Sequence, residues 1–429
     1  MKKKKILSFL LAGVMIGQTV PIGTMIVSAE EKSMVGEEQL SDKKTAAPEK
    51  DKAVPNSSQY KYQKDELAAF CHFGPNTFTG KEWGDNYGDT DPNQLFTLKE
   101  NFDAETLVKT IKEAGFKKLI ITAKHHDGFC LWNSEYTTYD VASTDYAKKN
   151  YDNMGGDILA EISAACTKED IDMGLYLSPW DIHEPSYGNN SPGDYNEFYN
   201  NQLKEILGNN KYGNGGKFVE IWMDGAKGGG ADPQDYTIDK WYETITKYEG
   251  EECLIFGAGP YASVRWIGNE NGEAADETWS KSILTEDNKI KNDPSQREDD
   301  FKGDPTDHFS NGYAEGNKWT VPEVDARITS GWFWGNGKST PKSMEQLANM
   351  YFSSVGRNAP LLLNIPPNNK GTVDDAILNR VKEFGNAVKE TFTNNIAAGK
   401  NVSCTASEVR GNDIAYSPNN VLDGNQDTY

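Results

Sequence analysis

The chain contains little cysteine for its length, with five residues in 429 and no Cys-x-x-Cys pair. The five are scattered, at Cys71, Cys130, Cys166, Cys253 and Cys404. This spacing fits neither a zinc-binding motif nor the even framework of a disulfide-stabilised domain. We therefore expect free thiols that behave mostly as small buried apolar side chains.

Basic residues are also scarce. The 44 Lys and Arg are outnumbered by 65 Asp and Glu, which gives a formal net charge of −21. Nucleic-acid phosphates would repel so acidic a surface, so no nucleic-acid partner is expected. The remaining composition, 37% hydrophobic and 25% charged, is that of a globular protein. It excludes wholesale disorder and collagen-like repeats, and the length fits one large domain with appendages.

The first 29 residues have the pattern of an export signal. Residues 2–5 are all lysine, residues 6–27 are mostly apolar, and Val27-Ser28-Ala29 offers small residues for cleavage. Gln18 and Pro21 interrupt the apolar run and disfavour a retained membrane anchor. We expect residues 1–29 to be removed, leaving no membrane insertion. Export without a disulfide framework suggests a secreted or cell-surface protein of a Gram-positive type of bacterium.

Residues 30–60 predict a disordered linker, because Lys, Glu, Asp, Ser, Ala and Pro alternate there with few large apolar residues. The other end of the chain, residues 396–429, is polar and predicted to be strand-like. Its last ten residues resemble the opening of a discoidin-like (coagulation factor 5/8 C-terminal) β-sandwich, a module that often binds galactose-type sugars. We expect a truncated start of such a carbohydrate-binding module, with a disordered tail as the alternative.

Residues 61–395 alternate short β-branched or aromatic runs with amphipathic stretches. Eight runs are predicted strands, at residues 68–73, 118–123, 174–177, 218–223, 254–256, 264–267, 327–329 and 360–365. Helices are predicted at 104–115, 155–171, 195–207, 235–248, 343–355 and 373–388, with none clear after the fifth strand. Nearly continuous apolar strands are typical of a parallel sheet covered on both faces, and eight such units predict a catalytic (β/α)8 TIM barrel. A doubly wound sheet is the alternative, although no Gly-x-Gly-x-x-Gly follows the first strand.

In such a barrel, functional groups follow the carboxyl ends of the strands. His72, His125, His126 and His183 follow predicted strands, and His308 does not. Adjacent histidines diverge on a strand and show no chelating spacing, so we expect no metal. Ten Trp and 20 Tyr favour a sugar site in which imidazoles bind hydroxyls and rings pack on sugar faces. A structural role stays open for any single histidine.

Two carboxyl groups are placed as a retaining glycosidase requires. Asp224 ends the predicted strand 218–223, and Glu270 lies in a Gly/Asn-rich loop. One of the two would be an ionised nucleophile and the other a protonated acid, about 5–5.5 Å apart. Asp224 could instead cap a turn before Gly225. Glu273 and Glu277 are alternatives to Glu270.

The ordered motifs resemble family 29 glycoside hydrolases, the α-L-fucosidases. They are His72-Phe73-Gly74, Glu82-Trp83, Lys124-His125-His126-Asp127-Gly128-Phe129, Gly174-Leu175-Tyr176, Ile221-Trp222-Met223-Asp224-Gly225 and Gly331-Trp332-Phe333. The resemblance implies a retaining mechanism without metal or cofactor, with Asp224 as nucleophile. It also implies that His72, Glu82, Trp83, His125, His126 and Tyr176 bind fucose hydroxyls, and that Trp222 and Trp332 pack near the ring or its methyl group.

The Gly268-Asn269-Glu270 stretch looks like the subfamily restricted to α-1,3 and α-1,4 fucosyl branches, whose acid/base is placed like Glu270. The expected function is thus a secreted exo-α-L-fucosidase acting on Lewis-type oligosaccharides or on mucin and milk glycans. Asp181, His183, Glu323 and Asp325 are candidates for contacts with the acceptor sugars. A barrel glycosidase for another deoxy or neutral sugar, and a non-catalytic sugar-binding surface protein, are the alternatives.

Overall fold

The structure, a computed structural model, describes most of the chain beyond residue 33. The described residues are 34–42, 44–46, 51, 53–149, 156–228, 230–257, 259–290, 311–335, 337, 339–398, 402–425 and 428. The chain divides into two compact units, one of residues 52–386 and one that combines residues 1–51 with residues 387–429. The expected export signal at residues 1–29 and His308 lie outside the described residues.

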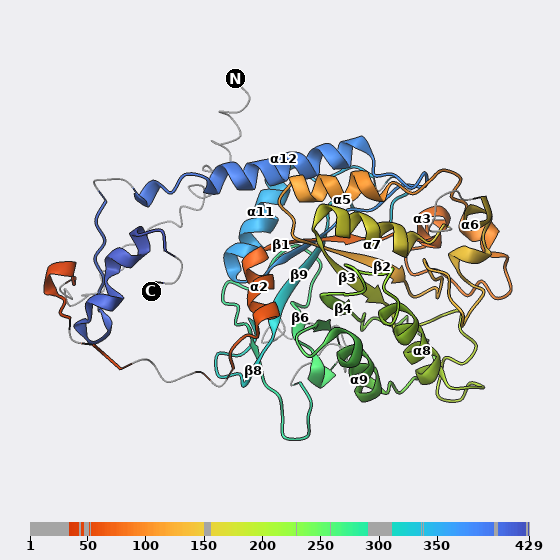
Figure 1. Cartoon of the computed structure of the whole chain (residues 1–429), viewed down its shortest axis with the longest axis horizontal. Coiled ribbons are helices and arrows are strands. Elements are labelled where there is room, and N and C mark those ends of the chain that lie inside the picture. The colour runs from red at the N-terminus through yellow and green to blue at the C-terminus, as the bar shows by residue number, and fades with distance from the viewer. Residues whose placement is uncertain are drawn as a thin grey trace. The chain divides into compact units, whose positions relative to one another are not determined.

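A closed barrel of eight parallel strands forms the centre of the larger unit (Figure 1). Its strands are β1 (Leu67–Cys71), β2 (Lys118–Lys124), β3 (Asp172–Leu177), β4 (Glu220–Trp222), β5 (Leu254–Phe256), β6 (Val264–Trp266), β9 (Val321–Arg327) and β10 (Leu361–Asn364). They pair in this order, and β10 closes the barrel on β1. A short antiparallel pair, β7 (Lys281–Ser282) with β8 (Lys318–Trp319), lies in the connection from β6 to β9. The predicted (β/α)8 barrel is confirmed, and the doubly wound alternative is wrong.

Helices follow six of the eight barrel strands in the described part of the chain. The longer ones are α5 (Ala104–Glu113), α7 (Ile158–Glu169), α8 (Tyr195–Leu207), α9 (Ile238–Glu249), α11 (Met344–Ser354) and α12 (Asp375–Phe392). Asp103, Asp157, Asp194 and Ser343 each start a helix by accepting a hydrogen bond from the backbone amide three residues on. The shorter helices are α2 (Ser57–Asp65), α3 (Pro75–Thr79), α4 (Pro92–Leu95) and α6 (Asp145–Lys149). None of the described helices has the length and apolar composition needed to cross a membrane.

The irregular crossover after the fifth strand is confirmed, because the described residues between β5 and β6 hold only the 3-10 turn η3 (Gly259–Tyr261). The seventh barrel strand differs from the prediction. It spans Val321–Arg327, whereas the apolar pattern places it at residues 327–329. An apolar run is the usual signal of a barrel strand, and here Pro322, Glu323 and Asp325 interrupt that run. In the fold both carboxylates are buried and accept hydrogen bonds from indole or phenol donors, which makes their burial tolerable.

The interior of the barrel is filled with side chains from every strand. One buried cluster contains Ala68, Phe70, Ile120, Tyr176, Trp222, Leu254, Phe256, Val264, Val321 and Leu362. Successive residues of a strand point to opposite faces, so the residues between these face the surrounding helices. This packing holds the carboxyl ends of the strands in fixed positions.

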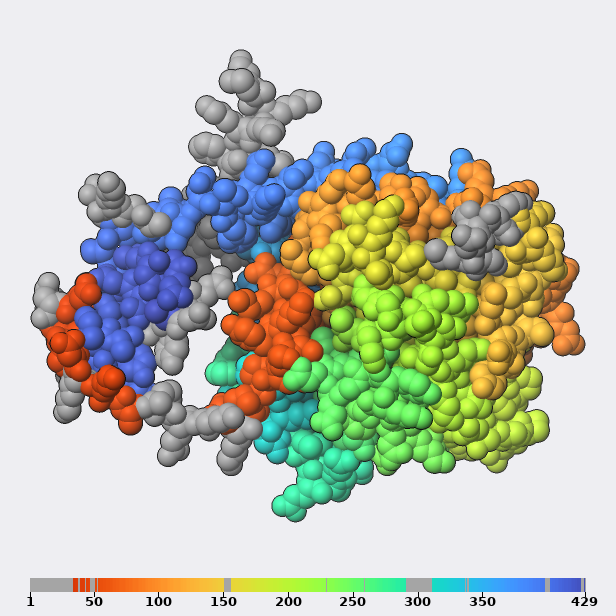
Figure 2. Space-filling view, in the orientation of Figure 1, coloured from red at the N-terminus to blue at the C-terminus, as the bar shows by residue number. Residues whose placement is uncertain are grey.

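The amino end of the barrel carries a buried ion pair and is covered by α2. Lys118 and Glu220 start β2 and β4, and their paired side chains are 4% and 0% exposed. Tyr62 of α2 places its ring 3.1 Å from the Lys118 ammonium and donates a hydrogen bond to Glu323. The outer face of α2 lies at the surface (Figure 2), whereas Gln59 and Tyr62 are buried. Helix α2 therefore seals the end of the barrel opposite to the carboxyl ends of the strands.

The C-terminal tail differs from the strand-like expectation. Its described residues contain the 3-10 helices η7 (Arg410–Asn412), η8 (Ile414–Tyr416) and η9 (Pro418–Leu422), and two isolated bridges, Val35 with Ala406 and Ser41 with Asp413. Asp413 and Ser417 each accept a hydrogen bond from the amide two residues on, a contact that favours turns over strands. The discoidin-like assignment stays a prediction.

Part of the expected linker at residues 30–60 has regular structure. Helix α2 begins at Ser57, inside that stretch, and the 3-10 turn η1 (Glu37–Gln39) lies near its start. The larger unit begins at residue 52. The remaining domain boundaries stay predictions.

All five cysteines are free. Cys71, Cys130 and Cys166 are buried, and the other two are partly buried. Burial raises the pKa of the Cys130 thiol well above its ordinary value, which keeps it protonated. The prediction of free thiols is confirmed.

Candidate active site

Polar and aromatic side chains gather where the barrel strands end. His72 follows β1, His125 and His126 follow β2, and His183 follows β3, so each described histidine lies beyond the carboxyl end of a strand, as predicted. The ring of His125 lies 4.2 Å from that of His126 and 5.8 Å from that of His72. These three imidazoles are buried and form one cluster.

Hydrogen bonds determine the tautomer of His72. Asn364, at the end of β10, donates through its side-chain amide to the carbonyl of Trp332 at 2.7 Å. Its amide oxygen is therefore left to accept from Nδ1 of His72 at 2.8 Å, and Nε2 becomes an acceptor. Burial lowers the pKa of His72 to about 3, against the opposing effect of the Asn364 bond. The imidazole is thus neutral near pH 7.

His126 is oriented in the same way. Ser178 donates its hydroxyl hydrogen to the carbonyl of Trp180 at 2.7 Å and so accepts from Nδ1 of His126 at 2.8 Å. Nε2 is then an acceptor, 3.6 Å from Oδ2 of Asp224. Burial lowers the pKa of His126, although the charges of Asp224 and Asp181 oppose this. Two acceptors at this separation can share one hydroxyl donor, the group that a sugar offers.

His125 keeps one ring nitrogen without a partner. Its Nδ1 is buried and has no hydrogen bond within the described part of the chain. The ring stacks on Tyr176, with centroids 5.5 Å apart and planes 8° apart, and meets the edge of Phe333 at 5.0 Å. Burial lowers the pKa of His125 well below its ordinary value. Because an unpaired buried nitrogen is costly, it is a natural contact for a polar group of a ligand.

Asp224 follows β4 with its carboxyl group held at both oxygens. Tyr176 donates its hydroxyl hydrogen to Oδ2 at 2.9 Å, and the amide of Ala226 donates to Oδ1 at 2.8 Å. Tyr176 is itself fixed by stacking on Trp222, with centroids 5.2 Å apart. The hydrogen bond from the Ala226 amide is the turn contact that the capping interpretation predicts. The other oxygen, Oδ2, is directed at the histidine cluster, on a side chain that is 22% exposed.

Glu270 reaches the same region from the loop after β6. Its Oε2 accepts a hydrogen bond from Nε1 of Trp332 at 3.2 Å and lies 3.4 Å from Nη2 of Arg327. The Glu270 side chain is 42% exposed, and its partial burial raises its pKa, to which the charges of Glu82 and Asp224 add. The Arg327 guanidinium and the Trp332 bond lower it, and the net direction is upward. A carboxyl group with a raised pKa suits a proton donor.

The two alternative carboxylates of this loop are placed differently. All three carboxylates are exposed, and Glu277 accepts a hydrogen bond from Trp279 at 3.0 Å. Glu270 is the one of the three that bonds to Trp332 of the cluster. The structure therefore favours Glu270.

Trp332 connects the loops of the site. Its backbone amide donates to Oε2 of Glu82 at 3.1 Å, and its carbonyl accepts from Asn364. Its ring lies 4.9 Å from that of His72, and its Nε1 donates to Glu270. Segments that follow β1, β6 and β9 therefore meet the end of β10 at this one residue.

The two remaining predicted aromatics differ in exposure. Trp83 is 44% exposed and makes edge contacts with the rings of His126 at 5.8 Å and Trp180 at 5.7 Å, so part of its aromatic surface is open to a sugar. Trp222 is 5% exposed and lies between Phe256, stacked at 3.9 Å, and Tyr176. Both faces of Trp222 are covered by these rings, which makes it a support for Tyr176. Its expected packing near the sugar ring or its methyl group stays a prediction.

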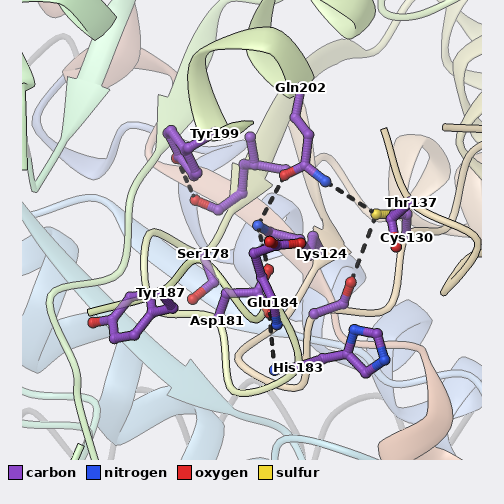
Figure 3. Close-up of polar contacts among 12 residues, drawn as sticks. Lys124, Cys130, Thr137, Ser178, Asp181, His183, Glu184, Tyr187, Tyr199 and Gln202 are labelled. Atoms are coloured by element: carbon purple, nitrogen blue, oxygen red, sulfur yellow. Dashed lines mark hydrogen bonds and ion pairs between the residues drawn. The ribbon is translucent and has the colours of Figure 1, made fainter. Parts of the chain in front are cut away.

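A buried polar network joins β2, the loop after β3 and α8 (Figure 3). The fully buried Lys124 ammonium bonds to Oδ2 of Asp181 and to Oε1 of Gln202, both at 2.9 Å. Oδ1 of Asp181 accepts from the backbone amides of His183 and Glu184. Asp181 is thus used in shaping the loop after β3, and its expected contact with an acceptor sugar is wrong.

Two further acceptor-sugar candidates are also wrong. Glu323 is 0% exposed and Asp325 is 5% exposed, and both lie inside the barrel because alternate residues of β9 face inward. Burial raises the pKa of both carboxyl groups. The fourth candidate, His183, is partly exposed and stacks on Tyr139 at 3.9 Å, and its role stays a prediction.

The contacts above join all ten predicted site residues into one cluster, although their roles stay predictions. Sequence reasoning missed Asn364 and Arg327. Asn364 lies at the end of an apolar strand, and the same pattern predicted His72 as a site residue. Arg327 was missed because the seventh strand was predicted to begin, not end, at this residue. Among the described residues, no three His, Cys, Asp or Glu side chains are grouped as metal ligands would be.

Residues 33–391 match the protein family described as Alpha-L-fucosidase. Alpha-L-fucosidase 1 of Arabidopsis thaliana is 39% identical over 377 residues, which cover 88% of this chain and 68% of the plant protein. The chain belongs to the α-L-fucosidase family. A second plant relative of this fucosidase, the putative alpha-L-fucosidase 1 of Oryza sativa, is 38% identical and is covered over 65% of its length. The chain therefore spans about two thirds of these relatives.

The fucosidase fold is shared with a solved family 29 fucosidase of Ruminococcus gnavus in complex with fucose. That protein is 56% identical, with a TM-score of 0.84 over 92% of this chain and 79% of that chain. The predicted resemblance to family 29 is confirmed. The protein is accordingly an α-L-fucosidase, a glycoside hydrolase of fucose-containing glycans, while its linkage subfamily stays a prediction.

Proposed function

We propose that this fucosidase is an exo-acting, retaining enzyme in which Asp224 is the nucleophile and Glu270 is the acid and base. The hydrogen bond from Tyr176 to Oδ2 of Asp224, beside three neutral imidazoles, carries the proposal. It directs a carboxylate to the place where hydroxyls can be bound, while Glu270 approaches from another loop with a raised pKa. Double displacement needs one ionised and one protonated carboxyl group.

The reaction has two steps. Oδ2 of Asp224 attacks the anomeric carbon of fucose, the bond from that carbon to the glycosidic oxygen breaks, and Glu270 transfers its proton to the departing oxygen. In the second step Glu270 removes a proton from water, the water oxygen attacks the anomeric carbon, and the carboxylate of Asp224 leaves. Two inversions retain the configuration.

The neutral imidazoles suit the hydroxyls of fucose. His72 and His126 present Nε2 as an acceptor, and His125 has an unpaired nitrogen. Trp83 and Trp332 supply aromatic surface for the ring and its methyl group. Because fucose lacks a 6-hydroxyl, an apolar wall there would reject galactose. The Ruminococcus gnavus relative, solved with fucose, supports this choice of sugar.

We further propose that the substrates are α-1,3- and α-1,4-linked fucosyl branches of Lewis-type glycans, such as those of mucin or milk. The Gly268-Asn269-Glu270 pattern supports the linkage. The signal-like residues 1–29 support export to the surface of a bacterium.

The roles of the carboxylates are tested by single substitutions. Asp224→Asn is expected to reduce hydrolysis of an aryl fucoside to background. Glu270→Gln is expected to lower kcat/KM about 10²–10⁴-fold on a fucosyl oligosaccharide and much less on the aryl fucoside, whose leaving group needs no proton. Azide should restore turnover of the aryl substrate by Glu270→Gln and form fucosyl azide. Glu273→Gln, in the same loop, is the matched control and should act like the wild type.

Wild-type-like turnover by Asp224→Asn would refute the nucleophile assignment. The linkage proposal is tested separately by measuring fucose release from oligosaccharides of defined α-1,2, α-1,3, α-1,4 and α-1,6 linkage. NMR of the anomer that forms first reports retention. Equal release from all four linkages, or an inverted first product, would contradict the corresponding part of the proposal.

A further inference from the structure

Arg327, the last residue of β9, lies against Glu270 where the strand ends. Its Nη2 is 3.4 Å from Oε2 of Glu270, and its guanidinium carbon is 5.3 Å from the centre of the Trp332 ring. Its partner across the strand pair is Asn364 of β10, the residue that orients His72. Arg327 is therefore part of the rigid frame of the site, with a side chain that is 28% exposed.

The guanidinium and the indole act on the same carboxyl oxygen. Nε1 of Trp332 donates to Oε2 of Glu270 at 3.2 Å, and the contact with Arg327 is also to Oε2. A proton on Oε2 would face two donors, so a protonated Glu270 carries its proton on Oε1. Oε1 is then the atom that gives a proton to the leaving oxygen and takes one from water.

The charges around Glu270 come from several elements. Glu82 after β1, Asp224 after β4 and Asp325 within β9 are acidic groups that interact with it, and negative charge there favours its protonated form. Arg327 opposes them as a cation and favours the ionised form. The reaction needs both forms in turn, because Glu270 is an acid in the first step and a base in the second.

The surroundings of Arg327 favour arginine over lysine. The planar guanidinium lies over the Trp332 ring while it faces Glu270, an arrangement that a point-charged ammonium cannot reproduce. Lys342 donates a hydrogen bond to the backbone carbonyl of Arg327 at 2.6 Å. Burial, with the Arg327 charge, lowers the pKa of Lys342.

We propose that Arg327 is a positioning residue that keeps Oε2 of Glu270 occupied and Oε1 free, and that sustains the second step by favouring ionised Glu270. The inference rests on the proposed role of Glu270 as acid and base. It assigns to Arg327 a function in turnover rather than in fucose binding.

Arg327→Met tests this role, since it removes the charge and keeps an apolar stem. With an aryl fucoside the first step needs no acid, so we expect kcat and KM to fall together by about tenfold while kcat/KM is preserved. The fucosyl ester then accumulates, and azide, which needs no base, should restore kcat.

On a fucosyl oligosaccharide the basic limb of the kcat/KM profile should move to higher pH, because the cation that lowers the pKa of Glu270 is gone. Arg327→Lys keeps the positive charge, so the basic limb should stay at the pH of the wild type and kcat should fall less than in Arg327→Met.

The controls separate failure of this inference from failure of the proposed function. Glu270→Gln should abolish the basic limb and respond to azide, and if it does neither, the role of Glu270 itself is wrong. If Glu270→Gln behaves as expected but Arg327→Met lowers kcat/KM equally at every pH without azide rescue, the positioning role is overturned. Arg327→Lys with the same profile as Arg327→Met would overturn the argument from charge. Affinity for fucose and thermal unfolding report whether each variant keeps its site.

Discussion

At the scale of single residues, burial decides which hydrogen bonds the histidines can offer. His72 and His126 each use Nδ1 on a neighbouring side chain, so Nε2 is the nitrogen left for a ligand. A neutral imidazole accepts at that nitrogen, whereas an imidazolium can only donate. Because sugar hydroxyls are both donors and acceptors, keeping these rings neutral widens what the site can bind. Because of the same burial, the free energy of unfolding depends on the protonation of His72.

The stability of the protein should fall on acidification through His72. Its pKa is about 3 in the folded chain and near 6.5 when unfolded, so between these pH values the unfolded state binds a proton that the folded state does not. From pH 7 to pH 5 this lowers the free energy of unfolding by about 2 kcal/mol. His72→Gln should therefore lose about 2 kcal/mol less than the wild type over that range. Urea unfolding at the two pH values measures the difference, and an equal loss in both proteins would contradict it.

At the scale of elements, α2 precedes the alternating strands and helices and covers the amino end of the barrel. Its capping box, in which Asn56 and Gln59 exchange bonds with each other's backbone, starts the helix close to the barrel. Gln59 also donates to the carbonyls of Ser263 and Trp319, and Tyr62 donates to Glu323. Glu323 in turn accepts from Trp222, which supports Tyr176 at the other end. Sealing one end of the barrel thus contributes to holding the site at the other.

Removing the hydroxyl of Tyr62 should destabilise the protein. Tyr62→Phe leaves one oxygen of the buried Glu323 without its donor, which costs about 1–3 kcal/mol of unfolding free energy. Tyr60→Phe is the matched control in the same helix, because Tyr60 is 54% exposed, and it should change stability by less than about 0.5 kcal/mol. Urea unfolding at pH 7 compares them, and equal stability of the two variants would count against a sealing role of α2.

At the scale of the whole molecule, every residue assigned to the site belongs to the unit of residues 52–386. The barrel core and the loops after β1 to β10 are contained in it, and the cluster between His72 and Asn364 needs no residue of the other unit. The chemistry should therefore reside in the barrel unit.

Shortening the chain tests this division. A protein of residues 52–395 is expected to hydrolyse an aryl fucoside with a kcat/KM within about twofold of the full chain, because a domain with its own core keeps its site. Circular dichroism and thermal unfolding show whether the shortened chain is folded. A folded but inactive protein would mean that the other unit contributes to catalysis.

Local patterns in the chain were sufficient for the barrel and for most of the site. The period of apolar residues and the placement of His72, His125 and Asp224 after strands involve neighbours in sequence, and the physics of strands and barrel ends acts on such neighbours. Pro322 and the carboxylates of β9 broke the pattern, and there the prediction failed.

The hydrogen-bond partners required the folded chain. His72 and Asn364 are 292 residues apart, and Glu270 and Trp332 are 62 apart, yet each pair is bonded. Whether Glu323 contacts a sugar or a tyrosine depends on which strands close the barrel and what seals it. Strand pairing and packing bring distant residues together, and no local propensity records the result. The barrel is thus encoded locally, while tautomers, the setting of Glu270 and the part played by Arg327 come from packing.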